Sequence, residues 1–226
     1  MNTMNTQHSD KMDLRFSHPS NALVCAPSGA GKSYLVKKIV EKRSEMFNVT
    51  FEKIIWFYSE QQSIYDELAQ EQGVHFVEGA PTLDQFPPGE GPKLIIVDDF
   101  MDQIKNPEFL KIAIKGSHHR NLSFWFLSQC IFPPNFRQIS LQAHYVILLK
   151  SPRDVQQIRT FVLQVDPTNW KGMLEAYEDA TREGHSYILF DFHVRQKDHL
   201  RLRTHIFPGE TTVVYIPKGK YKSQHI

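Results

Sequence analysis

The residues with the clearest chemical potential form a short loop, APSGAGKS, that runs from Ala26 to Ser33. The loop matches the Walker A pattern G-x-x-x-x-G-K-[ST], except that Ala26 replaces the first glycine. Gly29 and Gly31 permit the tight turn that points backbone N–H groups at a chain of phosphates. Lys32 supplies a positive charge for the β- and γ-phosphates, and the Ser33 hydroxyl supplies a ligand for Mg²⁺. The loop therefore predicts binding of a nucleoside triphosphate.

A strand before this loop and a helix after it would hold the loop in place. Residues 22–25 are small and apolar, which favours a buried strand, and apolar residues at helical spacing follow Lys32. The helix start adds unpaired N–H groups and the positive end of the helix dipole. The alternative is a turn of small residues that binds nothing. The predicted nucleotide-binding residues are Ala26, Pro27, Ser28, Gly29, Ala30, Gly31, Lys32, Ser33 and Tyr34.

A second chemical pattern, KLIIVDDF, covers residues 93–100. Residues 94–97 are continuously apolar, which is typical of a central parallel strand, and two carboxylates follow as in a Walker B motif. We expect Asp98 to hold Mg²⁺ together with Ser33, and Asp99 to polarise the attacking water. Burial of a carboxylate is costly unless a metal ion or a hydrogen-bond donor compensates for it. Without the Walker A loop, a helix N-cap beside a surface acid would explain this pair equally well.

Strands and helices alternate along the chain, which predicts an α/β fold with a parallel, doubly wound sheet. Strands are expected at 51–58, 74–77, 94–97, 123–128 and 144–150, and an antiparallel edge pair at 186–192 and 200–207. Helices are expected at 63–72, 106–116, 136–142, 153–163 and 170–182. Gln129 ends the strand 123–128, and in the additional-strand branch of P-loop NTPases such a residue lies between the two Walker strands. There it can sense the γ-phosphate and position water, although a plain strand cap is the alternative.

Composition is ordinary for a globular protein, with a net charge of only +1, so any contact with DNA must come from a local patch or from an oligomer. No apolar run approaches the ~20 residues of a membrane span, and we see no signal peptide. The two cysteines, Cys25 and Cys130, form no disulfide framework and suit a reducing compartment. We expect a flexible N-terminal arm at 1–20, a P-loop ATPase domain at 21–208 and a basic tail at 209–226.

Several blocks of the sequence together resemble a known family. The blocks are APSGAGKS, LIIVDDF, GSHHRNLSFWFLSQ, ISLQAHYVILLKSPRD and LRLRTHIFP. They resemble the genome-packaging ATPases of the FtsK–HerA superfamily, especially those of large DNA viruses, virophages and Polinton-type elements. The resemblance covers residues 21–208. It implies a three-layer, additional-strand fold of the RecA/FtsK type and a ring-forming ATPase that uses Mg²⁺ with ATP and drives double-stranded DNA into a preformed capsid.

The resemblance also assigns roles to individual residues. Lys32 and Ser33 correspond to the Walker A pair, Asp98 and Asp99 to the Walker B pair, and Gln129 to the sensor. The family often has glutamate as the second acid. Because aspartate is shorter by one methylene, action through an intervening water is the alternative to Asp99 serving directly as the base.

A trans-acting arginine is also implied, since related ring motors supply one to a neighbouring subunit. Arg120 lies just before the sensor strand, in a turn that we expect to be exposed, and is the first candidate; Arg153 in SPRD is the second. A surface salt bridge is the alternative for either residue. The histidines His118, His119 and His144 do not form a zinc-like set with cysteines.

The implied partners are double-stranded DNA, other copies of the chain in a homo-oligomeric ring, and a capsid vertex or portal protein, with no membrane. Lys218, Lys220 and Lys222 of the tail are candidate DNA contacts, unless the tail is simply a solvated end. The implied location is the host cytoplasm or nucleus where virions assemble, or the virion itself. Because no RNase-H-like domain follows, we expect any DNA cutting to need another protein.

Two other functions remain open at this stage. A small P-loop nucleotide kinase would need an arginine-rich lid, and residues 170–184 contain none that we recognise. A nucleotide-dependent assembly or adaptor protein would bind ATP but show no hydrolysis stimulated by DNA. Comparing ATP hydrolysis with and without double-stranded DNA separates these possibilities.

Overall fold

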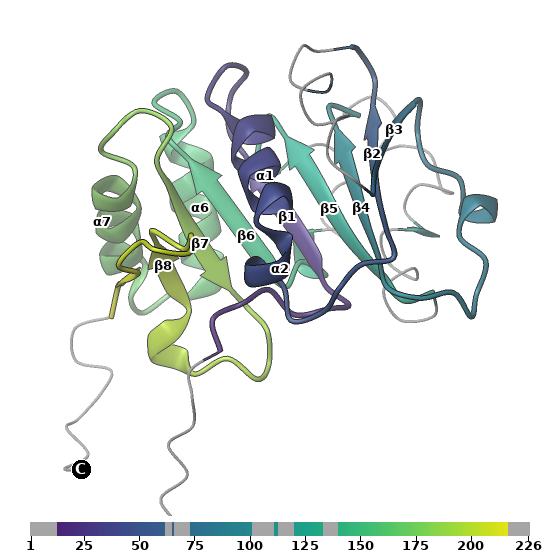
Figure 1. The fold of residues 1–226 in the computed structure, drawn as a ribbon. Helices are drawn as coiled ribbons and strands as arrows, with labels where there is room; N and C mark the ends of the chain where they lie inside the picture. Colours follow the sequence, from purple (N-terminus) through teal and green to yellow (C-terminus); the bar gives the residue numbers. More distant parts are fainter. Residues whose placement is uncertain are drawn as a thin grey trace, which may run out of the picture.

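The computed structural model describes residues 13–61, 65, 73–100, 111–112, 120–132 and 140–216. Within this part of the chain, one sheet has the strand order β3-β2-β4-β5-β1-β6-β7-β8-β9 (Figure 1). The strands are β1 (Asn21–Cys25), β2 (Lys53–Tyr58), β3 (Val74–Glu78), β4 (Lys93–Asp98), β5 (Leu122–Ser128), β6 (Tyr145–Leu149), β7 (Tyr187–Asp191), β8 (Leu202–Thr204) and β9 (Val213–Val214). The helices are α1 (Lys32–Glu41), α2 (Arg43–Met46), α6 (Val155–Val165) and α7 (Trp170–Ala180), with short 3-10 turns at Leu83–Gln85 and Asp198–Leu200.

The sheet confirms the predicted mixture of strand directions. Strands β1 to β6 pair with one another in parallel, whereas β7 pairs antiparallel with β6, and β8 and β9 continue antiparallel to the edge of the sheet. Strand β5 lies between β1 and β4, because Asn21 pairs with Phe124 on one side and Lys93 pairs with Leu122 on the other. This is the additional-strand arrangement. It places the carboxyl ends of the three central strands β4, β5 and β1 side by side.

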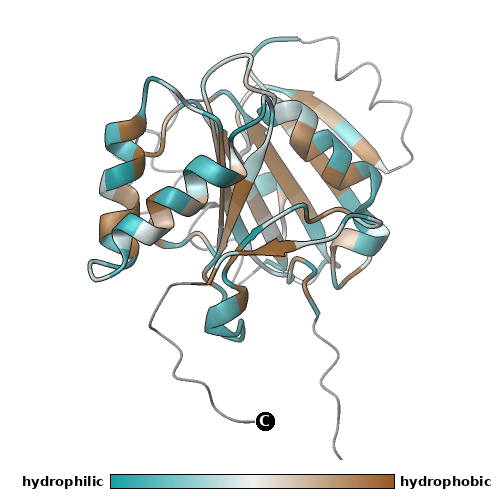
Figure 2. Ribbon diagram, turned by 90° about the vertical axis from the view of Figure 1, so that its left-hand side faces the viewer, coloured by the Kyte–Doolittle hydropathy of each residue, from teal (hydrophilic) through white to brown (hydrophobic). Residues whose placement is uncertain are grey.

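Helices cover both faces of the sheet, which makes three layers. The alternation of side chains along β1 shows the division, because successive residues of a strand point to opposite faces. Ala22 and Val24 pack with the apolar face of α1, while Leu23 and Cys25 pack with α6 and α7. Figure 2 shows hydrophobic strands in the centre with helices on either side of them. The central strands are buried on both faces, as their continuous apolar sequences predicted.

The segment before β1 differs from the predicted flexible arm. From residue 13 onward it is packed: Phe16 is 2% exposed, and its ring contacts those of Phe47, Trp125 and Tyr145. His18 bonds the hydroxyl of Ser123 at 2.7 Å. The arm prediction over 1–20 is therefore wrong for residues 13–20, because an aromatic side chain there completes the core.

At the other end, the ordered fold extends past the expected boundary at residue 208. Strand β9 pairs with β8 through Arg203 and Val214, and the Tyr215 N–H donates to the carbonyl of Leu202 at 2.9 Å. Residues 213–214 thus continue the sheet. The rest of the predicted tail lies outside the described residues.

Three predicted helices also fall mostly outside the described residues. Only Tyr65, residues 111–112 and residues 140–141 represent them, and each of these is helical. The other predicted helices are confirmed. Both α6 and α7 begin and end within two residues of the expected bounds. No helix in the described part of the chain is long and apolar enough to cross a membrane.

Candidate nucleotide-binding site

The loop between β1 and α1 has the backbone of a phosphate-binding turn. Gly29 and Gly31 have φ angles of +76° and +96°, which L-residues with a side chain rarely adopt. Gly31 also caps α1, whose first turn contains no acidic residue. The positive end of the helix dipole is therefore not neutralised by the chain itself, which suits an anionic ligand.

Ala26 is the one departure from the Walker A pattern, and the structure explains why alanine is accepted there. Ala26 is not among the described residues with a positive φ angle, so its backbone needs no glycine. Its side chain is 3% exposed and packs in the same core cluster as α1. Its N–H donates to the carbonyl of Ser128 at 3.1 Å, which extends the ladder between β1 and β5 into the loop.

The Lys32 ammonium lies inside the curve of this loop. Its Nζ donates to the carbonyl oxygens of Ala26 at 2.7 Å and Pro27 at 3.2 Å. Burial lowers the pKa of Lys32, while the carboxylates of Asp98 and Asp99 act in the opposite direction. The phosphates of a nucleotide would supply the negative charge that this partly buried cation lacks.

Walker A and Walker B meet through a hydrogen bond between Ser33 and Asp98. The Ser33 Oγ donates to Oδ2 of Asp98 at 2.7 Å, and the hydroxyl of Tyr65 donates to the same oxygen at 3.1 Å. Burial raises the pKa of Asp98, and the hydrogen bonds from Ser33 and Tyr65, together with the charge of Lys32, oppose that shift. A hydroxyl and a carboxylate oxygen at this spacing fit the oxygen ligands that Mg²⁺ prefers, so Ser33 and Asp98 suit the predicted metal-binding role.

Asp99 and Gln129 meet just beyond the carboxyl ends of the neighbouring strands β4 and β5. The side-chain amide of Gln129 donates to Oδ1 of Asp99 at 2.9 Å, and Ser59 Oγ donates to the main-chain oxygen of Asp99 at 3.0 Å. Asp99 has a φ angle of +62°, an uncommon conformation for a residue with a side chain and one that clusters at functional sites. Both Asp99 and Gln129 are exposed, so water and ligand can reach them.

Arg120 is placed differently from the expectation that its side chain projects from the subunit. Its Nη1 donates to the carbonyl oxygen of Leu83 at 2.8 Å and also to that of Phe86. It precedes the amino end of β5, whereas the Walker motifs lie at the carboxyl ends of the parallel strands. The expectation of an exposed turn is therefore wrong, because two carbonyls of the neighbouring loop hold the guanidinium. Its role in a neighbouring subunit stays a prediction.

Arg153 lies beyond the carboxyl ends of the parallel strands, on the same side of the molecule as the candidate nucleotide site. It follows β6, which runs parallel to β1, and its side chain is exposed. It forms no hydrogen bond or ion pair with the described residues that would tie it to its own subunit. Its position makes Arg153 the better placed of the two arginines to reach a neighbouring subunit, a role that also stays a prediction.

Three residues of this region had no signal in the sequence. Ser59 and Tyr65 contact the two Walker B aspartates, as described above. His185, in the loop between α7 and β7, lies against the Walker A loop: its Nδ1 is 3.2 Å from the carbonyl oxygen of Ala30, 155 residues away in the chain. A Cβ added to Gly31 would lie 2.9 Å from the same nitrogen, so a larger residue at that position would displace the exposed His185 ring.

The remaining candidates are placed as follows. Tyr34 is 63% exposed beside the loop. His144 lies at the amino end of β6, where its Nδ1 accepts a hydrogen bond from the Asn21 N–H at 3.0 Å, so it has a structural contact. His118, His119 and the three tail lysines lie outside the described residues. Among the residues that are described, no group of three or more His, Cys, Asp or Glu side chains could hold a metal ion.

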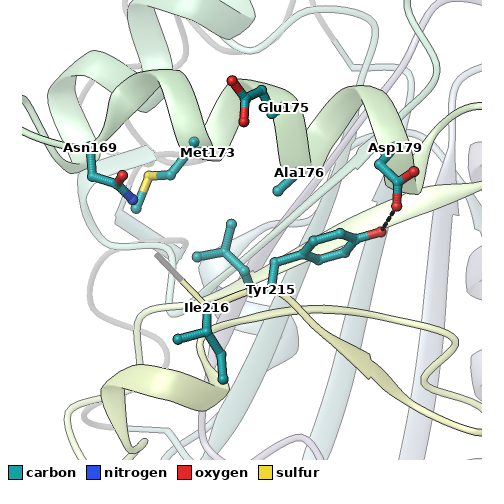
Figure 3. Close-up of a pocket in the computed structure, with 9 residues that line it drawn as sticks. Asn169, Met173, Glu175, Ala176, Asp179, Tyr215 and Ile216 are labelled. Atoms are coloured by element: carbon teal, nitrogen blue, oxygen red, sulfur yellow. Dashed lines mark hydrogen bonds between the residues drawn. The ribbon is translucent and has the colours of Figure 1, made fainter. Parts of the chain in front are cut away.

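A separate cavity of about 750 Å³ lies between α7 and the C-terminal strands (Figure 3). Met173, Ala176 and Ile216 line it, and the hydroxyl of Tyr215 donates to Oδ2 of Asp179 at 2.8 Å on its border. None of the predicted site residues contributes to this cavity. The candidate nucleotide site is therefore separate from this cavity.

Comparisons with known proteins agree with this geometry at the level of the fold. No protein-family model matches the sequence, and no curated protein matches it either. The genome packaging NTPase B204 from Sulfolobus turreted icosahedral virus 2, solved in complex with ATP-gammaS, is similar at a TM-score of 0.50 and 14% identity, over 88% of this chain and 98% of that one. B204 from Sulfolobus turreted icosahedral virus, described as a DNA-packaging ATPase, has a TM-score of 0.54 and 13% identity over the same shares.

A third similar structure is the cytoplasmic domain of the type VII secretion ATPase EccC from Thermomonospora curvata. It has a TM-score of 0.54 and 13% identity, over 90% of this chain and 26% of that chain. The matches to B204 span nearly the whole of both chains, whereas this one is to a quarter of a longer protein. The chain therefore has the three-layer P-loop ATPase fold that is also found in two viral genome-packaging ATPases and in a type VII secretion ATPase.

Proposed function

We propose that this chain is an ATP-hydrolysing motor that moves double-stranded DNA into a viral capsid. The observation that carries the proposal is a pair of hydrogen bonds at the carboxyl ends of the central strands. Ser33 bonds to Asp98, and Gln129 bonds to Asp99. The first pair suits a metal-bound triphosphate, and the second suits a water molecule. The fold shared with B204 over nearly the full length of both chains supports the packaging role.

The division of labour follows from where each group lies. Lys32 and the N–H groups of the loop bind the β- and γ-phosphates, and Ser33 and Asp98 hold the magnesium ion. That ion, when bound with ATP, offsets the negative charge of the phosphates. Asp99 and Gln129 orient a water for attack on the γ-phosphorus, and Asp99 accepts the proton that this water loses. The bond between the γ-phosphorus and the bridging oxygen breaks, and ADP is released with phosphate.

The motor would act as a ring of identical subunits. Hydrolysis of ATP requires charge stabilisation at the γ-phosphate, and a neighbour's arginine can supply it only when the ring is closed. Arg153, at the correct edge of the sheet, and Arg120 are the candidates. Double-stranded DNA would pass through the ring, and a capsid vertex or portal protein would anchor it during virion assembly.

The test is ATP hydrolysis by the full chain with and without linear double-stranded DNA. We expect DNA to raise the rate several-fold, and Lys32→Ala to abolish hydrolysis and weaken ATP binding because the phosphates lose their buried cation. Lys42→Ala, at the other end of α1, is the matched control and should hydrolyse normally. ATP binding with turnover indifferent to DNA would overturn the motor and favour an adaptor. Turnover that required an added nucleoside would favour a kinase.

A further inference from the structure

We propose that Tyr65 is a positioning residue for the nucleotide site, and that its phenol orients the Asp98 carboxylate for the magnesium ion that accompanies ATP. This inference rests on the proposed nucleotide-binding function and extends it to a residue outside both Walker motifs. Tyr65 belongs to the connection between β2 and β3, yet its hydroxyl reaches the end of β4.

The ring of Tyr65 is held rigidly by other aromatic rings. It is 2% exposed, and its centroid lies 4.9 Å from that of Tyr58, 5.4 Å from Phe76 and 5.9 Å from Trp56. Such packing leaves the ring little freedom to move, so the direction of its hydroxyl is determined by the core. The hydroxyl therefore acts as a fixed donor and not as a surface group that adapts to its partner.

The carboxylate of Asp98 needs such a donor. The terminal torsion of an aspartate side chain has broad energy wells, so one hydrogen bond leaves the carboxylate free to rotate. Ser33 Oγ and Tyr65 OH both donate to Oδ2, at 2.7 Å and 3.1 Å, from two different elements. Two donors on one oxygen determine the plane of the carboxylate, and within the described part of the chain Oδ1 accepts no hydrogen bond. In the proposed complex, Oδ1 would be the oxygen that meets the cation or its water shell.

Packing alone would be served equally well by phenylalanine. A buried hydroxyl is costly unless it is hydrogen-bonded, and a bond to a charged acceptor is among the stronger ones. Partners of metal ligands act in this way, and their loss typically costs about 10–100-fold in metal affinity.

The test is the magnesium dependence of ATPγS binding by Tyr65→Phe, which removes one oxygen and keeps the ring. We expect the Mg²⁺ concentration for half-maximal binding to rise about tenfold or more, and the affinity measured in EDTA to stay within about twofold of wild type. The control is Tyr145→Phe. Tyr145 is equally buried, and its hydroxyl accepts a hydrogen bond from the Ser17 N–H at 2.9 Å, at the opposite end of the sheet. This control should leave the magnesium dependence unchanged.

A purely structural role would give a different result. If the hydroxyl served only the packing of the core, Tyr65→Phe would lose the same ATPγS affinity with Mg²⁺ as in EDTA, or would lose no affinity in either condition. Either outcome overturns the proposal. A second comparison is Asp98→Ala with and without Tyr65→Phe. If the phenol acts through Asp98, the second substitution should add no further magnesium requirement, and an added loss would contradict that route.

The two proposals can fail separately. Binding of ATPγS is measured without hydrolysis and without DNA. A wild-type chain that binds Mg²⁺–ATPγS but shows no DNA-stimulated turnover contradicts the motor alone. A Tyr65→Phe variant with wild-type magnesium dependence contradicts the positioning role alone.

Discussion

The side-chain amide of Gln129 donates a hydrogen bond of 2.9 Å to the Asp99 carboxylate, across two neighbouring parallel strands. Gln129 follows β5 and Asp99 follows β4, so the pair exists because β5 is inserted beside the Walker B strand. The amide N–H groups are donors and the carboxylate is an acceptor, so a water between this pair and the γ-phosphate would find both kinds of partner.

Substitution of the two Walker B aspartates should separate their roles. Asp99→Asn is expected to keep ATP bound while the hydrolysis rate falls ~10²–10⁴-fold, the usual contribution of a general base. Asp98→Asn is expected instead to weaken nucleotide binding in the presence of Mg²⁺, because the metal ion loses the carboxylate that acts beside Ser33. Binding of ATPγS and steady-state hydrolysis measure the two effects. Variants that behave alike in both assays would show that the roles are not divided.

Alanine substitutions at three glycines should have graded effects on the free energy of unfolding. Gly31→Ala meets both an unfavourable φ angle and the ring of His185, whereas Gly29→Ala meets only the angle. We expect Gly29→Ala to lose ~1–2 kcal/mol, Gly31→Ala to lose more, and Gly184→Ala, with neither a positive φ nor a close neighbour, to be tolerated. Denaturant unfolding measures the series. Equal losses at Gly31 and Gly29 would mean that the His185 ring moves aside at no cost.

Mixing experiments should identify the trans-acting arginine. Arg153→Ala is expected to fold and bind ATP but to lose much of its hydrolysis, since such residues contribute ~10³–10⁵ in rate. Mixed with Lys32→Ala subunits, it should recover activity, because one variant keeps an intact pocket and the other an intact arginine. The hydrolysis rate of the mixture against each variant alone decides the matter, provided that mixed rings form.

The same mixture made with Arg120→Ala is the comparison. We expect this variant to be destabilised, because the carbonyls of Leu83 and Phe86 lose their donor. Recovery with Arg120→Ala and none with Arg153→Ala would return the role to Arg120.

Binding to double-stranded DNA should depend strongly on salt. With a net charge of +1, the chain has no global attraction for DNA, so binding would rest on local contacts with phosphates. Each contact adds about −0.9 to the slope of log affinity against log salt concentration. Replacing Lys218, Lys220 and Lys222 with glutamine should make the slope shallower if the tail contributes. Affinity that does not change with salt would argue against a motor that follows the DNA backbone.

The packed segment before β1 should make stability depend on pH. Burial lowers the pKa of His18 from the ordinary 6.5, against the effect of its hydrogen bond to Asn121. A histidine with a lowered pKa in the folded state takes up protons more readily when unfolded, so its contribution is complete above pH 6.5 and falls as the pH drops below that value. Thermal unfolding at pH 7.5 and 5.5 should show a smaller difference for His18→Gln than for wild type. An equal or larger difference would assign the effect to other groups.

The sequence alone determined the parts of this protein that depend on short spacings. The loop APSGAGKS, the apolar strand ending in Asp98 and the strand ending in Gln129 each specify their local structure. Parallel strands align their carboxyl ends, so the meeting of Ser33 with Asp98 and of Gln129 with Asp99 followed from strand order. Local patterns sufficed because glycine angles, helix starts and buried strands are set by neighbouring residues.

Only the tertiary structure decided which distant side chains complete the site. Tyr65 reaches Asp98, His185 closes on the Walker A loop from 155 residues away, and Phe16 fills the core beside Trp125. It also turned Arg120 inward to the carbonyls of Leu83 and Phe86. None of these contacts has a periodic or spaced signature in the sequence, because each depends on how the sheet and its connections pack in three dimensions.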